Sequence, residues 1–75
     1  MVDNRIMTYK IAERLKELRN KMGISQAKLG EAIGLDQRFI GNIEAGRKLI
    51  SINTLVLLAD FFGVSADYIL GRDNY

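Results

Sequence analysis

Residues 25–44, SQAKLGEAIGLDQRFIGNIE, decide the fold of this chain, because they have the pattern of two short helices joined by a glycine turn. Ser25 is a favourable N-cap residue, and the apolar residues after it do not alternate in steps of two, which favours a helix up to Gly34. A glycine just past the last periodic residue can take the left-handed conformation that ends many helices. Gly34 is therefore predicted to end the first helix of the pair.

Asp36 is placed to cap a second helix over residues 37–45, and Gly46 ends that helix in the same way. A helical wheel separates its residues into a polar arc and an apolar arc. The polar arc holds Gln37, Arg38 and Asn42 with the small residues Gly41 and Ala45, and the apolar arc holds Phe39, Ile40 and Ile43. A polar arc of this kind suits a helix that is pressed against hydrogen-bonding edges. The major groove of DNA is such a surface, since glutamine and asparagine can pair bidentately with adenine and arginine with guanine.

The sequence resembles the phage repressor and Cro-like helix-turn-helix proteins, also called the xenobiotic-response-element-like family. The resemblance covers nearly the whole chain through the segments RLKELRNKMGISQAKLGEAIGL, IGNIEAGRK and LADFFGVSADYILG, in the order and spacing of that family. It implies an all-α, compact five-helix domain of the lambda-repressor-like type, with the helix-turn-helix at helices 2 and 3. In such motifs the second helix enters the major groove. Gln37, Arg38 and Asn42 are therefore the candidate base-reading residues.

The 75 residues predict one domain, close to the size at which a single core is only marginally sufficient. Cysteine and histidine are both absent, so disulfides, nitrogen–sulfur metal sites and the usual base–nucleophile pairs are excluded. Ser25 and Lys28 match the S-x-x-K spacing of a serine nucleophile with a lysine base, but a helix N-cap explains Ser25 fully. We predict no enzymatic activity, no catalytic residue, no metal and no cofactor.

Nothing near Met1 has the pattern of a signal peptide, and the longest strongly apolar run, residues 55–59, is far too short to span a bilayer. A cytoplasmic protein without a membrane partner is expected. The net charge is only +2. Residues 1–48 hold ten basic and six acidic side chains, whereas residues 49–75 hold one basic and three acidic. This asymmetry would let one end face phosphates, although an ordinary solvated surface explains it equally well.

The remaining helices are predicted from apolar periodicity and glycine stops. The first helix is expected from Thr8 or Tyr9 to Met22, after a loose leader over residues 1–7. The fourth helix is expected after the N-cap Ser51 and ends at Phe62; because it is apolar nearly all round, it is predicted to be the central, most buried helix. A short last helix is expected over residues 66–70, after the N-cap Ser65. The domain would then cover residues 8–70, with residues 71–75 as a tail.

The resemblance also implies roles for residues outside the polar arc. An arginine at the position of Arg19 commonly pairs in the family with the glutamate that ends the recognition helix, which is Glu44 here. The family often has glutamine at the position of Gln26, where it contacts a phosphate. Two cations beside the helix terminus, Arg47 and Lys48, form a plausible phosphate clamp, and Lys28 would contribute at longer range. Without the resemblance, a solvated loop would be the better interpretation of residues 47 and 48.

Dimerisation is expected because one recognition helix reads only a few base pairs. In the family, the loop before helix four and the last helix commonly form the dimer contact, although such residues are more often simple core. The positions concerned here are Ile50, Ile52, Ala66, Tyr68 and Ile69. Two subunits would read an inverted repeat with half-sites separated by ~34–36 Å.

The sequence thus predicts a sequence-specific regulator of transcription, a repressor in the first instance, that binds double-stranded operator DNA as a homodimer. Its action at a promoter would be the occlusion or recruitment of RNA polymerase. The alternative is a helix-turn-helix module that docks on a protein, as an anti-repressor or a bridging factor does, with little sequence-specific DNA binding. Loss of binding with added salt and with Arg38→Ala distinguishes the first from the second.

Overall fold

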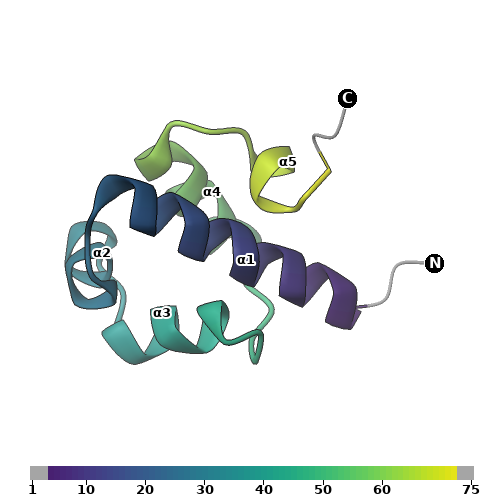
Figure 1. Ribbon diagram of the computed structural model, residues 1–75, viewed down its shortest axis with the longest axis horizontal. Coiled ribbons are helices and arrows are strands. Elements are labelled where there is room, and N and C mark those ends of the chain that lie inside the picture. The colour runs from purple at the N-terminus through teal and green to yellow at the C-terminus, as the bar shows by residue number, and fades with distance from the viewer. Residues whose placement is uncertain (1–3, 73–75) are drawn as a thin grey trace.

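The computed structural model describes residues 4–72, and five helices make up its fold (Figure 1). They are α1 (Asn4–Met22), α2 (Gln26–Ile33), α3 (Gln37–Glu44), α4 (Ile52–Phe62) and α5 (Ala66–Ile69). The long helix α1 runs through the middle of the molecule, with α3 on one side of it and α5 on the other (Figure 1). Helix α2 packs against α3 and α4. The predicted all-α, five-helix fold is confirmed.

The predicted N-cap residues begin α2, α3, α4 and α5 where the sequence placed them, and α3 and α5 end one residue earlier than predicted, at Glu44 and Ile69. The side chains of Ser25, Ser51 and Ser65 each accept a hydrogen bond from the backbone N–H three residues on, and Asp36 accepts one from the N–H of Arg38. Gly34 follows α2 with φ +76°, in the left-handed region that glycine adopts without steric cost. Gly34 and Asp36 thus help to set the turn between α2 and α3 through hydrogen bonds within this segment.

One core joins all five helices. Its fully buried side chains are Ile11 and Leu15 of α1, Leu29 of α2, Ile40 and Ile43 of α3, Leu58 of α4 and Ile69 of α5. Each buried side chain of this size contributes roughly 1.5–3 kcal/mol relative to its exposed state. Because α3 supplies two of the seven, its apolar arc is held in the core and its polar arc faces outward, as the helical wheel predicted.

The first helix begins earlier than the sequence predicted. Helix α1 starts at Asn4, so residues 4–7 of the expected leader are helical and only residues 1–3 lie outside the described part of the chain. Met7 packs against the core and Thr8 is buried, which gives this first turn a tertiary reason to be helical. At the other end, residues 73–75 of the predicted tail also lie outside the described residues.

The prediction that the fourth helix is the central one was wrong. Only one side of α4 is covered, by α2 and α5, and it carries the buried residues Leu58 and Ala59. On the open side, Ile52 is 78% exposed and Val56 and Leu57 are about half exposed. The other four helices within residues 4–72 leave this side of α4 open, and α1 takes the central place. Neither α4 nor any other helix within residues 4–72 is long and apolar enough to cross a membrane.

Candidate nucleic-acid interface

The polar arc of α3 forms part of a shallow, open depression on the surface. The depression has a volume of about 420 Å³ and is lined by Gln26, Gln37, Arg38, Gly41, Asn42 and Arg47. Gln37 and Arg38 are exposed and Asn42 is half-buried. All three predicted base-reading residues therefore share one outward surface with two of the predicted phosphate-binding residues.

Two glycines allow α2 to lie close against the turn and against α3. A Cβ atom built on Gly30 would be 2.4 Å from the carbonyl oxygen of Leu35, so the α2 backbone touches the turn directly. A Cβ atom on Gly41 would be 3.3 Å from Oε1 of Gln26. This close approach places the first turn of α2 beside the middle of α3, where Gln26 joins the depression.

The ion pair between Arg19 and Glu44 holds the C-terminal end of α3 against α1. Nε and Nη2 of Arg19 donate to the two carboxylate oxygens of Glu44 at 2.6 and 3.0 Å, and Nη1 donates to the carbonyl of Ile24 at 2.7 Å. The side chain of Glu44 is only 3% exposed. Nε2 of Gln26 also donates to Glu44, at 3.1 Å. The sequence analysis did not predict the bond between Gln26 and Glu44, because the two residues are 18 positions apart and no local pattern indicates that they are in contact.

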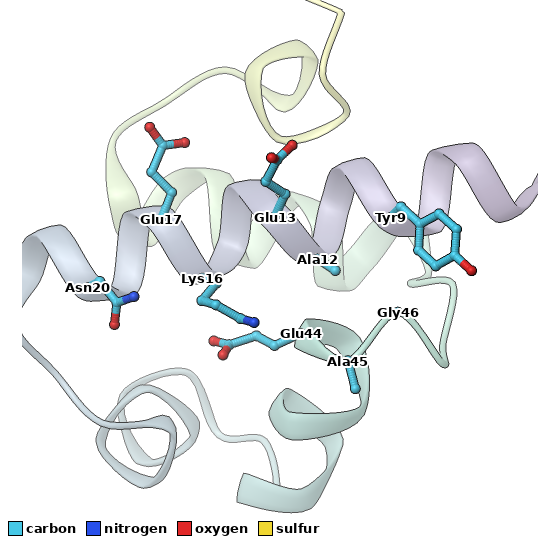
Figure 2. Close-up of a pocket in the computed structure, with 9 residues that line it drawn as sticks. All are labelled: Tyr9, Ala12, Glu13, Lys16, Glu17, Asn20, Glu44, Ala45 and Gly46. Atoms are coloured by element: carbon cyan, nitrogen blue, oxygen red, sulfur yellow. The ribbon is translucent and has the colours of Figure 1, made fainter.

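The Glu44 carboxylate is ionised despite its burial. Burial opposes its charge, but the hydrogen bonds from Arg19 and Gln26 and the positive charges of Arg19 and Lys16 outweigh that effect, and the pKa of Glu44 lies below its usual value. A groove of about 430 Å³ lies between α1 and the end of α3. Figure 2 shows Lys16 of α1 pointing toward Glu44 in this groove. The hydrogen bond to Glu44 likewise raises the pKa of Arg19. Both partners therefore stay charged near neutral pH.

The end of α3 brings Arg47 onto the same surface as Asn42. Nε of Arg47 donates to Oδ1 of Asn42 at 3.1 Å, and the backbone N–H of Arg47 donates to the carbonyl of Asn42 at 3.0 Å. Gly46, with φ +76°, makes the reversal of the chain possible. The sequence analysis placed Arg47 only in a phosphate-binding loop and missed its contact with a candidate base reader. Gly46 could have indicated this contact, because a left-handed glycine after a helix folds the next residue back toward the last turn.

The other two predicted phosphate-binding residues lie outside the depression. Lys28 is exposed on α2 and pairs with Glu31 at 3.7 Å. Nζ of Lys48 lies 6.0 Å from the centre of the Phe39 ring. Both lysines are on the surface, Lys28 on α2 of the helix-turn-helix and Lys48 in the loop after α3, and their contact with phosphate stays a prediction.

The residues expected at a dimer contact differ widely in exposure. Ile69 is fully buried in the protomer's own core, because α5 packs against α1, so its assignment to an interface was wrong. Tyr68 is half-buried; its hydroxyl donates to Glu17 at 3.1 Å and Arg14 lies over its ring at 4.2 Å. Ile50 and Ala66 are also half-buried. Of the five, only Ile52 is exposed.

Comparison with known protein families gives a match that covers most of these elements. The helix-turn-helix family model HTH_3, of the Cro/C1 type, matches residues 15–69, which run from the middle of α1 through α5. The chain belongs to this family. Its members are DNA-binding transcription regulators.

Curated relatives of known name agree with the family. The chain is 33% identical over 64 residues to the HTH-type transcriptional regulator ImmR of Bacillus subtilis, covering 85% of this chain and 50% of ImmR. It is 32% identical over 64 residues to the control protein C.SmaI of Serratia marcescens, covering 85% of this chain and 76% of C.SmaI. The chain spans about half the length of ImmR. It also spans about half the length of YobD, an uncharacterized HTH-type transcriptional regulator of Bacillus subtilis.

Solved structures show the same fold. The restriction-modification controller protein C.AhdI from Aeromonas hydrophila superposes with a TM-score of 0.76 at 31% identity, covering 83% of this chain and 94% of C.AhdI. The hypothetical transcription factor NHTF from Neisseria superposes with a TM-score of 0.82 at 26% identity, covering 93% of this chain and 80% of that one.

Proposed function

We propose that this chain is the DNA-binding part of a transcription regulator that reads a specific operator by placing α3 in the major groove. One observation carries the proposal. The polar side of α3 faces outward in a single depression, whereas its apolar side is anchored in the core by Ile40 and Ile43. A rigid helix with exposed amide and guanidinium groups has the chemistry to read base edges. The names of ImmR, C.SmaI and C.AhdI support a regulatory role, with repression as the first expectation.

In this proposal, Gln37, Arg38 and Asn42 contact bases, while residues on either side of α3 contact the DNA backbone. Gln26 lies at the first turn of α2, where unpaired backbone N–H groups also favour an anion. Arg47 and Lys48 follow the end of α3, and Lys28 lies on the exposed side of α2. Phosphate contacts supply the salt-dependent part of the affinity, and base contacts supply discrimination.

We further propose that two copies bind an inverted repeat. An eight-residue recognition helix reaches only a few base pairs, so a second copy is needed to specify a longer site. The open side of α4 is the surface we assign to the contact, because it exposes Ile52, Val56 and Leu57 together with the preceding Leu49. Of the residues that the sequence analysis assigned to the dimer contact, Ile52 stays in the proposed contact and Ile69 is excluded from it.

Selection of bound sequences from a random double-stranded DNA pool tests the proposal. The expected result is an enriched inverted repeat whose half-sites are about one helical turn apart. Arg38→Ala should then weaken binding to the selected site by roughly 5- to 150-fold, the range that ~1–3 kcal/mol per base contact implies. Arg72→Ala removes the same charge from an exposed position beyond α5 and should leave the affinity about unchanged.

A module that docks on a protein would give a different result. It would bind the pool weakly, without an enriched sequence, and Arg38→Ala would have no more effect than Arg72→Ala. The dimer is tested separately by sedimentation equilibrium on Ile52→Glu, which should be monomeric at concentrations where the parent chain dimerises. Ile6→Glu, the same change at an exposed isoleucine of α1, is the matched control.

A further inference from the structure

The C-terminal end of α3 has the hydrogen bonds of a Schellman motif. The N–H of Gly46 donates to the carbonyl of Ile43 at 3.0 Å, and the N–H of Arg47 donates to the carbonyl of Asn42 at 3.0 Å. In this motif the residue after the left-handed glycine folds back beside the residue three positions before the helix cap. Apolar side chains usually meet at that point. Here the backbone brings a guanidinium, that of Arg47, beside an amide, that of Asn42.

We infer that Arg47 is a specificity-determining residue: it fixes the amide of Asn42 so that hydrogen-bond donors face the DNA, and the pair selects guanine instead of adenine. The inference rests on the proposed function. Nε of Arg47 donates to Oδ1 of Asn42 at 3.1 Å, and both side chains line the depression beside Gln37 and Arg38. Arg47 is thus part of the reading surface as well as a cation near the backbone.

The chemistry of the two purines decides which one such a pair accepts. Adenine offers an acceptor at N7 and a donor at N6, so an asparagine that reads it must donate with Nδ2 and accept with Oδ1. Guanine offers acceptors at both N7 and O6. In this structure Oδ1 of Asn42 already accepts from Arg47. A cationic guanidinium beside that oxygen disfavours the approach of another donor, and the two terminal nitrogens of Arg47 add further donors to the same site.

The first step of the test locates the base pair that Asn42 reads. Pool selection is carried out with the parent chain and with Asn42→Ala, and the position whose base preference disappears in the variant is assigned to Asn42. The parent chain should prefer guanine over adenine at that position by about 10-fold or more, within the range for a good base contact. Fluorescence anisotropy on two operators that differ only at this position gives the ratio directly.

The second step changes Arg47. Arg47→Ala frees Oδ1 of Asn42, so the guanine-to-adenine ratio should fall to about 1 or reverse in favour of adenine. Arg47→Lys keeps a positive charge in the loop but lacks the Nε donor and the planar guanidinium, so the ratio should fall while the dependence of affinity on salt changes little. Lys48→Ala removes the neighbouring cation, and its effect should be an equal loss on both operators. Circular dichroism checks that each variant is folded.

Three results would overturn the inference and leave the proposed function standing. The first is a parent chain that prefers adenine at the Asn42 position. The second is an Arg47→Ala variant that weakens binding to both operators equally, which is the behaviour of a plain phosphate contact. The third is an Asn42→Ala variant that changes no position of the selected site. A pool that yields no enriched sequence would instead reject the proposed function and this inference together.

Discussion

Replacing Arg19 by methionine is expected to destabilise the fold by about 3 kcal/mol, because it leaves the buried carboxylate of Glu44 without its main partner. Removing one member of a buried ion pair costs roughly 3–5 kcal/mol. The side chains of Arg19 and Glu44 are 15% and 3% exposed, so the arginine keeps some contact with water and the lower end of that range applies. The variant also removes the donor that binds the carbonyl of Ile24 at 2.7 Å.

This loss is large for a domain of 75 residues. Typical stabilities per residue give such a domain about 4–11 kcal/mol in total. A loss of about 3 kcal/mol corresponds to a fall in Tm of roughly 12–24 °C at this size. The measurement is urea unfolding followed by circular dichroism, in which the midpoint should fall while the slope of free energy against urea stays the same.

The matched control is Lys21→Met, which removes a cation from an exposed pair. Nζ of Lys21 lies 3.8 Å from Glu17, and the two side chains are 71% and 40% exposed. Its effect should stay within about 0.5 kcal/mol. Equal, small losses in Arg19→Met and Lys21→Met would refute the reasoning, because burial of the pair would then have no energetic consequence. In a double-mutant cycle with Glu44→Gln, the double variant should lose about 1–3 kcal/mol less than the sum of the single variants.

Three further predictions concern the frame that holds α3. The pKa of Glu44 is lower in the folded chain than its ordinary value of 4.5, so the unfolded chain takes up the proton first as the pH falls. The stability that ionised Glu44 contributes is therefore present above about pH 4.5 and is lost as the pH falls below that value. Acid titration of the unfolding free energy should show this loss in the parent chain and in Glu31→Gln, and a smaller loss in Glu44→Gln. Asp36→Ala should cost about 1 kcal/mol in urea unfolding, because the carboxylate accepts the N–H of Arg38 at 2.7 Å at the start of α3. Gly34→Ala should cost roughly 1–2 kcal/mol by the same assay; nothing lies within 4 Å of the added Cβ, so backbone strain at φ +76° is the sole cause, and an unchanged midpoint would contradict it.

The parts of the fold that could be predicted from the sequence depend on local chemistry. Ser25 and Asp36 cap helices because their side chains reach backbone groups two or three residues away, and Gly34 ends a helix by its own conformational freedom. The helical wheel of α3 also depends only on nearby residues. The helical period was enough to predict that Ile40 and Ile43 face the core, and both are fully buried.

The parts that were missed depend on which elements become neighbours. The apolar character of α4 gave no information on how many of its sides would be covered, and Ile52 remained on the surface. The sequence could not distinguish Ile69 from a surface residue, because its burial depends on the packing of α5 against α1. The same holds for the start of α1, where burial of Thr8 and packing of Met7 accompany a helix that begins at Asn4, ahead of the start that the apolar periodicity predicted.

The arrangement separates the residues that stabilise α3 from those we propose to read DNA. Ile40, Ile43 and Glu44 are buried and fix the position of the helix, whereas Gln37 and Arg38 point to solvent. Substitutions at exposed positions usually change stability by less than about 0.5 kcal/mol, whereas large-to-small changes of buried isoleucines cost about 2–5 kcal/mol. It follows that residues 37 and 38 can be exchanged without loss of the fold, so one frame can carry different operator preferences. Asn42 is the exception, because its amide accepts a hydrogen bond from Arg47, and a change there alters the surroundings of a second residue that we propose to read DNA.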